Sequence, residues 1–568
     1  MNRRIFGIKR RTRANSDIDP DEIFLDSRNL PAFDTNQFEG MLEKPIGTLS
    51  VIFVGIVFFL IVGIFSVKMW SLQVSDGQLY SDKSENNRLR HSAIFGERGV
   101  IYDRTGKLLA WNYVATSSPE FAKRKYIDMP GLSHVLGYVK YPSRDSSGFY
   151  YKENYDGMDG VEKTYNEWLS GVNGTQIIET DALGKLQSWN TIRPPQDGTS
   201  VRLSIDADLQ SRLYYYIEQT ATDIGFSGGA GVIMDVTTGE ILAITSYPEY
   251  DSNILSSGTD SAAIAGYVSN KNKPFLNRII NGLYTPGSIV KPFVALGALN
   301  EKIIDPKKEI LSTGSITIQN QYDKEKKSVF TDWKAHGLVD MRHALAVSSN
   351  VYFYEIGGGF EKQKGLGIIN LEKYYRMFGF GSSVDATFFD GVAGTIPNPA
   401  WKKVNFNNEP WRIGDTYFTA IGQYGFQIAP IQAVRAVAAV ANGGKLLRPS
   451  IISGGDGTPA LERVIPIAES DFQIVREGMR QGVLEGTGKG LNIPQVKVAS
   501  KTGTAELGTL KKNVNSWVEG FFPYDNPKYA FVVMMESGRR ENVIGGLFVM
   551  RSLFDWMVVH KPEYLKNN

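Results

Sequence analysis

An uncharged apolar stretch near the amino terminus constrains this chain more than any other feature. Residues 45–67, PIGTLSVIFVGIVFFLIVGIFSV, carry no charged side chain over 23 positions and are flanked by Lys44 and Lys68. As a helix rising about 1.5 Å per residue, the stretch reaches about 34 Å, which is enough to cross roughly 30 Å of hydrocarbon. The alternative is a cleaved signal peptide, but its apolar core usually has about 7 to 15 residues and lies closer to the terminus. We therefore expect a single permanent transmembrane helix at 45–67.

Residues 1–44 contain a basic cluster followed by the acidic segment DIDPDEIFLD, without apolar periodicity. This composition favours a disordered arm, which we expect to be cytoplasmic; a docking segment for a partner is the alternative. The basic cluster lies about 30 residues from the span, outside the window in which Lys and Arg set orientation. Charge alone therefore leaves the orientation open.

The length of the chain requires more than one domain, because 568 residues exceed the roughly 100 to 200 residues of a typical domain. A net charge of +2 gives no electrostatic reason to expect nucleic acid as a partner. The absence of cysteine excludes thiol catalysis, disulfides and cysteine metal sites. The five histidines are scattered, apart from His336 and His343, so we expect no metal and no cofactor.

Two folded regions are predicted after the anchor. In residues 68–200, ERGVIYDRTGKLLAWN favours a hairpin, and a short helix around 161–169 precedes a strand at 175–180. The segment RPPQDGTS, at 193–200, has the composition of a boundary. The first region is therefore expected to be strand-rich and irregular.

The second region, residues 201–568, has predicted strands at both ends and helices between them. A strand over VRLSID precedes a helix over ADLQSRLYYYIEQTATDI, and a hairpin follows at 229–248. Three more strands are expected over VKVASKTGTAE, NSWVEGFF and KYAFVVMMES, with a closing helix at about 545–559. This order predicts an α+β fold in which distant segments form one antiparallel sheet with helices packed on it.

Three short motifs occur in this second region. They are SIVK at 288–291, SSN at 348–350 and KTGT at 501–504. Each is weak alone, since a serine near proline and glycine also begins ordinary helices. Together, with the last motif on a predicted edge strand, they match the known catalytic set of penicillin-binding proteins and class A β-lactamases.

The resemblance extends from about residue 45 to residue 560 and is to class B penicillin-binding proteins. RGVIYDRTGKLLA and GVEKTYNEWLSGVNG resemble two signatures of the non-catalytic module of that family. IPNPAWKK and WRIGDTYFTAIGQYGFQIAPIQA are most similar to its elongation-type members, penicillin-binding protein 2. Two departures are Tyr424, where the family usually has glycine, and SSN in place of an SxD found in some relatives; neither removes a catalytic group.

The resemblance implies four parts. They are a cytoplasmic tail (1–44), a transmembrane helix (45–67), a non-catalytic pedestal of the dimerisation type (68–200) and a transpeptidase domain like that of serine β-lactamases (201–568).

The resemblance also implies catalytic roles. Ser288 would attack the penultimate D-alanine carbonyl of a stem peptide, with Lys291 as the base, because residues i and i+3 share one face of a helix. A lysine base must be neutral, which burial and the nearby charge of Lys501 would favour. Ser348 and Asn350 would pass the proton to the leaving D-alanine and orient the peptide; a helix-capping role for Ser348 is an alternative that does not exclude this one.

The third motif would hold the substrate. Lys501, Thr502 and Thr504 are expected to bind the terminal carboxylate of the stem peptide or of penicillin. Gly503 would let the substrate backbone approach the strand closely. The backbone amides of Ser288 and Thr504 would form the oxyanion hole.

The implied function is a peptidoglycan D,D-transpeptidase that cross-links stem peptides during elongation through a Ser288 acyl-enzyme and is acylated by β-lactam antibiotics. Alternatives are a division-type (septal) transpeptidase, or a scaffold or activator of a membrane glycan polymerase. A penicillin-hydrolysing enzyme is disfavoured, because such enzymes are usually soluble single domains. The sequence does not say whether the acceptor amine is diaminopimelate or lysine.

The implied partner is a multi-pass glycan polymerase of the rod-shape system, contacted through the 45–67 helix and the 68–200 module. Peptidoglycan lies outside the cytoplasmic membrane. The resemblance therefore implies a cytoplasmic amino terminus and a catalytic domain on the outer, periplasmic side.

Overall fold

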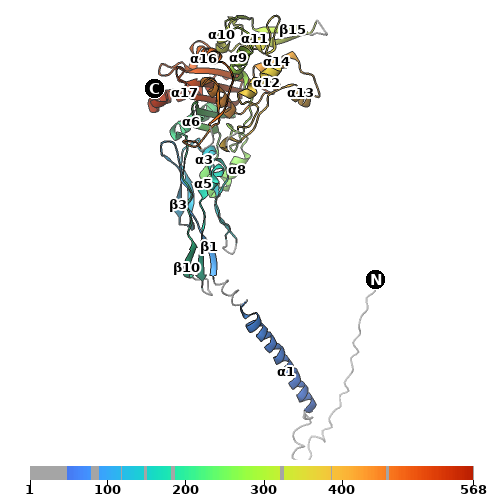
Figure 1. The fold of residues 1–568 in the computed structure, drawn as a ribbon, viewed down its shortest axis with the longest axis vertical. Helices are drawn as coiled ribbons and strands as arrows, with labels where there is room; N and C mark the ends of the chain where they lie inside the picture. Colours follow the sequence, from blue (N-terminus) through green and yellow to red (C-terminus); the bar gives the residue numbers. More distant parts are fainter. Residues whose placement is uncertain are drawn as a thin grey trace, which may run out of the picture. The chain divides into compact units, whose positions relative to one another are not determined.

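The computed structural model (Figure 1) describes residues 48–78, 89–116, 118–145, 150–180, 186–319, 325–384, 387–455 and 460–566. The expected disordered tail, 1–44, lies outside these residues. The chain forms two compact units, one made of Met1–Arg90 with Glu179–Ser188 and the other of His91–Ile178 with Trp189–Asn568.

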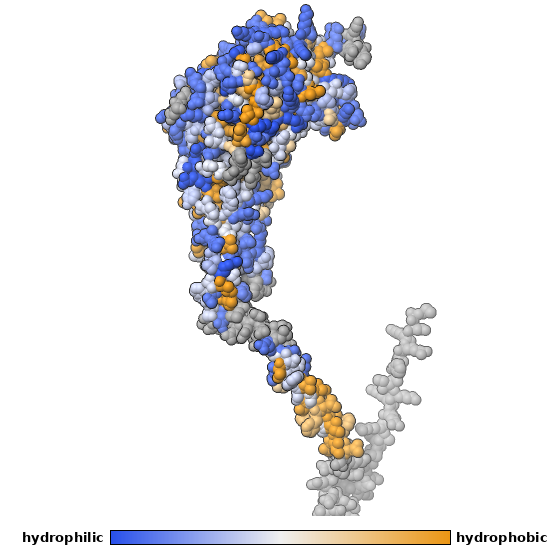
Figure 2. Space-filling view, viewed as in Figure 1, coloured by the Kyte–Doolittle hydropathy of each residue, from blue (hydrophilic) through white to orange (hydrophobic). Residues whose placement is uncertain are grey.

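The described part of the first unit is dominated by one apolar helix. Helix α1 (Thr48–Trp70) continues into a short π-helical turn at Ser71–Ser75. An 18-residue window within Val51–Ser75 has a mean hydropathy of 2.7 and is 0% buried. Figure 2 shows a hydrophobic surface over the lower part of this helix and hydrophilic side chains toward its upper end. A helix that is apolar all round is suited to a hydrocarbon environment. By length and composition α1 is able to cross a membrane.

The strand-rich module after the anchor contains a four-stranded sheet in the order β11-β2-β3-β4. Its strands are β2 (Ile101–Tyr102), β3 (Leu108–Ala115), β4 (Ser118–Tyr126) and β11 (Val201–Arg202). The predicted hairpin is β2-β3, and its turn is closed by Asp103, whose Oδ1 accepts from the amides of Thr105 and Lys107 at 2.8 Å each. This carboxylate supplies the acceptor that a turn of this kind needs.

The smaller elements of this module complete it. A second sheet has the order β1-β9-β10. The elements are β1 (Leu89–Ile94), α3 (Ser133–Leu136), β5 (Val139–Lys140), β6 (Ser143–Arg144), β7 (Tyr150–Lys152), β8 (Asp156–Gly157), α4 (Gly160–Thr164), α5 (Asn166–Ser170), β9 (Gly174–Thr180) and β10 (Leu186–Arg193). The single helix expected at 161–169 is thus two short helices, because Tyr165, with φ −107° and ψ 28°, leaves the helical conformation between them.

A buried ionic cluster ties this module together. The two oxygens of Glu162 accept from Arg98 Nε at 2.6 Å and from Arg124 Nε at 2.7 Å, and all three side chains are at most 1% exposed. Burial opposes ionisation of Glu162, but Arg124 and Arg98 together hold its pKa below the usual value. The carboxylate therefore stays charged and joins β4, α4 and the segment that precedes β2.

The second region is built on one antiparallel five-stranded sheet in the order β13-β12-β22-β21-β20. Its strands are β12 (Gly228–Asp235), β13 (Ile241–Tyr247), β20 (Ala499–Leu507), β21 (Asn513–Phe522) and β22 (Tyr529–Arg539). The prediction of one sheet assembled from both ends of this region is confirmed. Strand β20, which carries the KTGT motif, lies at the edge of the sheet, as expected.

Helices cover both faces of this sheet. Helices α6 (Ala207–Ile224) and α17 (Gly546–His560) pack on one face, and α15 (Pro430–Ala441) and α16 (Glu469–Leu484) pack on the other. Helix α6 has the predicted bounds, and its amino end is capped by Asp206, whose Oδ1 accepts from the amides of Asp208 and Leu209. The result is a three-layer α/β/α arrangement around two hydrophobic cores.

The remaining elements form the helical middle of this region and its small hairpins. They are α7 (Ser252–Ser257), α8 (Ser261–Ser269), η4 (Gly287–Val290), α9 (Lys291–Asn300), β14 (Ile310–Ser312), β15 (Ser315–Gln319), β16 (Lys327–Thr331), β17 (Gly337–Val339), α10 (Met341–Val347), α11 (Asn350–Gly358), α12 (Gly367–Met377), η5 (Thr387–Phe389), α13 (Pro399–Asn405), α14 (Ile413–Ala420), β18 (Lys445–Leu447), β19 (Leu461–Val464), η6 (Lys489–Leu491) and η7 (Pro562–Tyr564).

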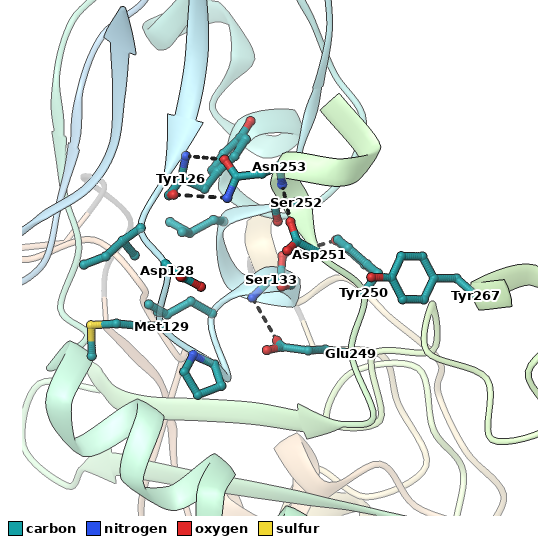
Figure 3. Close-up of a pocket in the computed structure, with 14 residues that line it drawn as sticks. Tyr126, Asp128, Met129, Ser133, Glu249, Tyr250, Asp251, Ser252, Asn253 and Tyr267 are labelled. Atoms are coloured by element: carbon teal, nitrogen blue, oxygen red, sulfur yellow. Dashed lines mark hydrogen bonds between the residues drawn. The ribbon is translucent and has the colours of Figure 1, made fainter. Parts of the chain in front are cut away.

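The two regions meet around a cavity of about 260 Å³, shown in Figure 3. Glu249 follows β13 and accepts from the amides of Gly131 at 2.6 Å and Ser133 at 3.0 Å. Asn253 exchanges two hydrogen bonds with the backbone of Tyr126, at 2.9 and 3.1 Å. Burial raises the pKa of Glu249 from 4.5 to about 7, against the effect of the two amides. The junction therefore depends on an acidic group that titrates near neutral pH.

Candidate active site

The first motif lies where a 3-10 turn becomes a helix. Ser288 is half-buried in η4, and Lys291 begins α9 and is fully buried. In a 3-10 turn the side chains at i and i+3 lie on the same side, which brings these two residues to one face. Pro292 stands in the first turn of α9, where a missing amide hydrogen costs nothing. Among the described residues no side chain caps η4, so Ser288 does not act as a helix cap.

The amine of Lys291 reaches the second motif. Its Nζ donates to Ser348 O at 2.8 Å, to Ser348 Oγ at 3.2 Å and to Asn350 Oδ1 at 2.7 Å. Burial and then the charge of Lys501 lower its pKa well below the usual value, while Asp332 acts in the opposite direction. A lysine of this kind is available as a base near neutral pH.

The second motif has an unusual backbone. Ser348 ends α10 in the left-handed conformation, with φ 60° and ψ 40°, and its amide donates to Ala344 O. The cap of the following helix, α11, is the neighbouring Ser349, whose Oγ accepts from Tyr352 N at 3.3 Å. The capping role that we considered for Ser348 therefore belongs to Ser349. The Ser348 hydroxyl instead accepts a hydrogen bond from Lys291.

An aspartate that the sequence reasoning missed holds this motif in place. Asp332 Oδ2 accepts from Ser349 Oγ at 2.8 Å, from Val351 N at 3.0 Å and from Ser312 Oγ at 3.3 Å. Its side chain is 0% exposed. Because these bonds fix the start of α11, they also fix Asn350. The only sequence signal for this role is an acidic residue directly after the strand β16.

The third motif brings a second buried lysine. Lys501 is 1% exposed on β20 and donates from Nζ to Thr502 O at 2.9 Å. Burial lowers its pKa to about 7, while Glu519 acts in the opposite direction. Thr502 Oγ1 donates to Thr487 Oγ1 at 2.6 Å, and Thr504 is exposed.

The edge of β20 lies directly against η4. A Cβ atom on Gly503 would stand 2.9 Å from Ile289 Cγ2 and 3.0 Å from Pro286 O, so the chain's own turn needs this glycine. A Cβ atom on Gly287, where φ is +59°, would stand 3.0 Å from Thr504 O. The segments that carry the amides of Ser288 and Thr504 are therefore adjacent.

A loop rich in aromatic residues adjoins the same turn. Gly287 N donates to Gly422 O at 2.9 Å. Two residues further on, Tyr424 adopts the left-handed conformation with φ 64°. Its ring stacks on Phe406 at 5.6 Å between centroids and meets Trp401 and Trp411 edge-on. Tyrosine in this conformation is strained, and the aromatic contacts hold it there.

The described residues contain no group of three or more His, Cys, Asp or Glu side chains that could hold a metal ion. The chemistry available to them is that of a serine hydroxyl, two buried lysines with lowered pKa values, a second hydroxyl and an amide. On an antiparallel sheet flanked by helices, this set defines a serine enzyme of the penicillin-recognising class.

The particular family follows from comparison with known proteins. The profile described as penicillin binding protein transpeptidase domain matches residues 229–546, and that of the penicillin-binding protein dimerisation domain matches 117–203. Since the first match covers more than half of the chain, the chain belongs to the penicillin-binding proteins with a transpeptidase domain. Within them it is a class B member of the elongation type, as the sequence predicted.

Curated relatives cover most of the chain. The peptidoglycan D,D-transpeptidase MrdA of Acinetobacter baumannii is 27% identical over an alignment of 595 positions, gaps included, that covers 87% of this chain and 85% of the relative. MrdA of Escherichia coli is 26% identical, over 90% of this chain and 93% of the relative.

Solved structures agree on the fold. Penicillin-binding protein 2 of Pseudomonas aeruginosa, in complex with WCK 5153, has a TM-score of 0.66 at 28% identity and covers 83% of this chain and 98% of its own. The complex between penicillin-binding protein 2 and MreC from Helicobacter pylori gives a TM-score of 0.69 at 26% identity, over 83% of this chain and 99% of that chain. The expected fold class is thus confirmed.

Proposed function

We propose that Ser288 is the nucleophile through which this elongation-type peptidoglycan D,D-transpeptidase cross-links stem peptides. Lys291 takes the proton from the Ser288 hydroxyl as the oxygen attacks the penultimate D-alanine carbonyl. The proton then passes by way of Ser348 to the amine of the departing D-alanine, so the acyl-enzyme forms without net loss or gain of protons. An amine of a second stem peptide then attacks the ester carbonyl and forms the new amide bond. Its proton passes through the same groups to the Ser288 oxygen, which leaves as the restored hydroxyl.

The observation that carries this proposal is the buried, hydrogen-bonded amine of Lys291. It contacts both Ser348 and Asn350, and burial lowers its pKa. Asn350 orients the peptide in this scheme, since its amide is already in the same network. A solvated lysine with its usual pKa would not serve as the base near neutral pH.

We assign the third motif to the substrate. The ammonium of Lys501 and the hydroxyls of Thr502 and Thr504 bind the terminal carboxylate, while Gly503 keeps β20 and η4 in contact and leaves the strand edge without a side chain. The amides of Ser288 and Thr504 form the oxyanion hole, where one donor is worth roughly 3 to 4 kcal/mol in the transition state. β-Lactam antibiotics would enter by the same contacts, with their carboxylate in place of that of D-alanine.

The division into four parts is also proposed, with bounds 1–44, 45–67, 68–200 and 201–568. Its support is the apolar helix α1 and the family matches at 117–203 and 229–546.

The protein is membrane-anchored, and we propose that its amino terminus is cytoplasmic and its catalytic domain periplasmic. The argument is that peptidoglycan, the substrate, lies outside the cytoplasmic membrane. A thiol-reactive label tests this orientation, because the chain has no cysteine of its own. A cysteine placed after residue 566 should react in intact spheroplasts, and one placed at residue 2 should not; the reverse pattern would exclude this topology.

The protein works with other cell-wall machinery. For the specific partner we propose a multi-pass glycan polymerase of the rod-shape system, contacted through α1 and the 68–200 module. The Helicobacter pylori relative was solved in complex with MreC, which supports a protein contact by this class of enzyme. Replacing α1 by an unrelated membrane helix should weaken co-purification with the polymerase; unchanged co-purification would limit the contact to the module.

Intact-mass spectrometry of the full-length protein in detergent tests the catalytic proposal. With benzylpenicillin, the wild-type protein should gain one adduct that persists for hours, and Ser288→Ala should gain none. An adduct that clears within seconds would favour a penicillin-hydrolysing enzyme. No adduct on the wild-type protein would favour the scaffold reading.

A further inference from the structure

A buried carboxyl group without any partner lies beside the second catalytic lysine. Glu519, on β21, is 0% exposed, and neither of its carboxyl oxygens has a hydrogen-bond partner among the described residues. In the antiparallel pairing of β20 with β21 it stands directly opposite Lys501. Buried polar groups are nearly always paired, so an unpaired carboxyl needs an explanation.

The surroundings of Glu519 are apolar except for that lysine. On its own strand Trp517 and Phe521 share its face and belong to a hydrophobic core, and its partner on β22 is Val532. Directly opposite residues of an antiparallel pair have Cβ atoms about 4.5 to 5.5 Å apart, so Lys501 and Glu519 share a side of the sheet.

Several other charged groups on the elements around β21 have partners elsewhere. They include Arg435 of α15 with Glu462, Arg480 of α16 with Val498 O, Arg551 of α17 with Asp555, and Glu536 of β22 with Arg278. Lys501 is the charged group that acts on Glu519: burial raises the pKa of Glu519 well above its usual value, and Lys501 opposes this rise. Each group therefore favours the charged form of the other.

We propose that Glu519 is a positioning residue that keeps Lys501 charged over a wider pH range than its burial alone would allow. The inference deepens the proposed function and rests on it, because that mechanism uses the Lys501 charge twice, to bind the substrate carboxylate and to lower the pKa of Lys291. In this proposal the first proton that the two groups lose comes from Glu519. The ammonium survives beside the new carboxylate until a second proton leaves at higher pH.

The sign of the effect follows from this order. With Glu519 replaced by glutamine, the first proton lost must come from Lys501 itself. The ammonium then disappears at lower pH, and the alkaline limb of the acylation rate moves down. A role in packing alone would change the rate or the stability but not the position of this limb.

The test measures the acylation rate of full-length protein by benzylpenicillin over about pH 6 to 10. In Glu519→Gln the alkaline limb should move down by about one pH unit, which is about a fivefold lower rate at the wild-type midpoint. Glu519→Asp, which keeps a carboxyl group, should restore the limb toward wild type. Ser500→Ala is the matched control, since its buried hydroxyl on the neighbouring strand also has no partner among the described residues; its profile should coincide with wild type.

A variant at Lys501 tests independently whether Glu519 acts through this lysine. In Lys501→Arg the guanidinium stays charged throughout this range, so adding Glu519→Gln should no longer move the limb. If Glu519→Gln does not fold, Glu519→Leu gives the same comparison.

An alkaline limb of Glu519→Gln that coincides with that of wild type would overturn the role of Glu519 and leave the proposed function intact. The absence of any Ser288 adduct on wild-type protein would overturn the proposed function itself.

Discussion

Ser348 combines a functional side chain with a strained backbone. A non-glycine residue at φ 60° costs about 1 to 2 kcal/mol relative to the right-handed region. The conformation lets one residue end α10 and still direct both its carbonyl and its hydroxyl to Lys291. Strain of this kind persists only where the surrounding structure enforces it. Here Lys291 binds the Ser348 carbonyl, and Asp332 binds the neighbouring Ser349.

Two substitutions at Ser348 separate strain from chemistry. Ser348→Gly and Ser348→Ala both remove the hydroxyl, and both should slow β-lactam acylation by about 100-fold or more, as expected for loss of a proton-transfer group. Only glycine relieves the left-handed strain, so Ser348→Gly should be more stable than Ser348→Ala by about 1 kcal/mol. Urea unfolding and acylation rates measure the two effects; equal stability of both variants would contradict the strain.

The residues of the proposed site differ in how far the sequence could predict them. Ser288 and Lys291 are three positions apart, so local helical geometry places them on one face and their motif is readable from the sequence. Asp332 and Glu519 act on residues brought beside them by the fold, through a strand end and a cross-strand register. A single sequence does not fix such long-range neighbours. A lone acid within the apolar strand NSWVEGFF was nevertheless a visible anomaly.

At the scale of elements, the ionic cluster around Glu162 is what holds the strand-rich module. Removing one member of a buried charge set leaves the others unpaired, which typically costs about 3 to 5 kcal/mol. Glu162→Gln should therefore destabilise this module strongly, since two buried arginines lose their shared anion. Hydrogen exchange of the β3 and β4 amides measures the loss.

The exposed pair of Glu120 with Arg144 provides the control for that prediction. Both side chains are more than 40% exposed, and exposed ion pairs contribute about 0 to 1 kcal/mol. Glu120→Gln should change exchange in β4 very little. A comparable loss in both variants would show that the buried cluster has no special importance.

The predicted bounds of an element agree with the observed ones where local residues, such as helix caps, determine its ends. Helix α6 was predicted with its observed bounds, because Asp206 caps it and Gly225 ends it in the left-handed conformation. The strand expected over VRLSID is only Val201–Arg202 in the structure. Beyond it Ser204 Oγ donates to Ile241 O and Asp206 caps α6, so tertiary contacts and the cap replace the strand pairing.

At the scale of the whole molecule, the junction at Glu249 should respond to pH. Its pKa in the folded protein is raised from 4.5 to about 7 by burial, so folding favours the protonated form. This stabilisation is fully present below about pH 4.5 and is lost as the pH rises through 7, with a total of about 3 kcal/mol. The measured quantity is the ratio of the amide exchange rate in wild type to that in Glu249→Gln, at Gly131 and Ser133. This ratio should therefore be larger at pH 8 than at pH 5.

Glu249→Gln removes the titrating group and keeps a similar shape. The variant loses part of the hydrogen bonding to the two amides at every pH, which shifts its exchange rates by a constant amount. Only the change of the difference with pH therefore reports the titration of Glu249. A difference between variant and wild type that does not change between about pH 5 and 8 would exclude Glu249 as the titrating group.

The order of strands in the sheet also determines when, during synthesis, the enzyme becomes able to react. The bond from Ser227 to Glu536 joins positions 309 residues apart, and Lys501 enters on a strand that is made long after Ser288. At about 5 to 20 residues per second, the interval between the two is on the order of 10 to 40 seconds. Throughout that time Lys291 lacks the neighbouring charge that lowers its pKa. On the proposed mechanism, the growing chain therefore becomes sensitive to acylating antibiotics only when its last strands have been added.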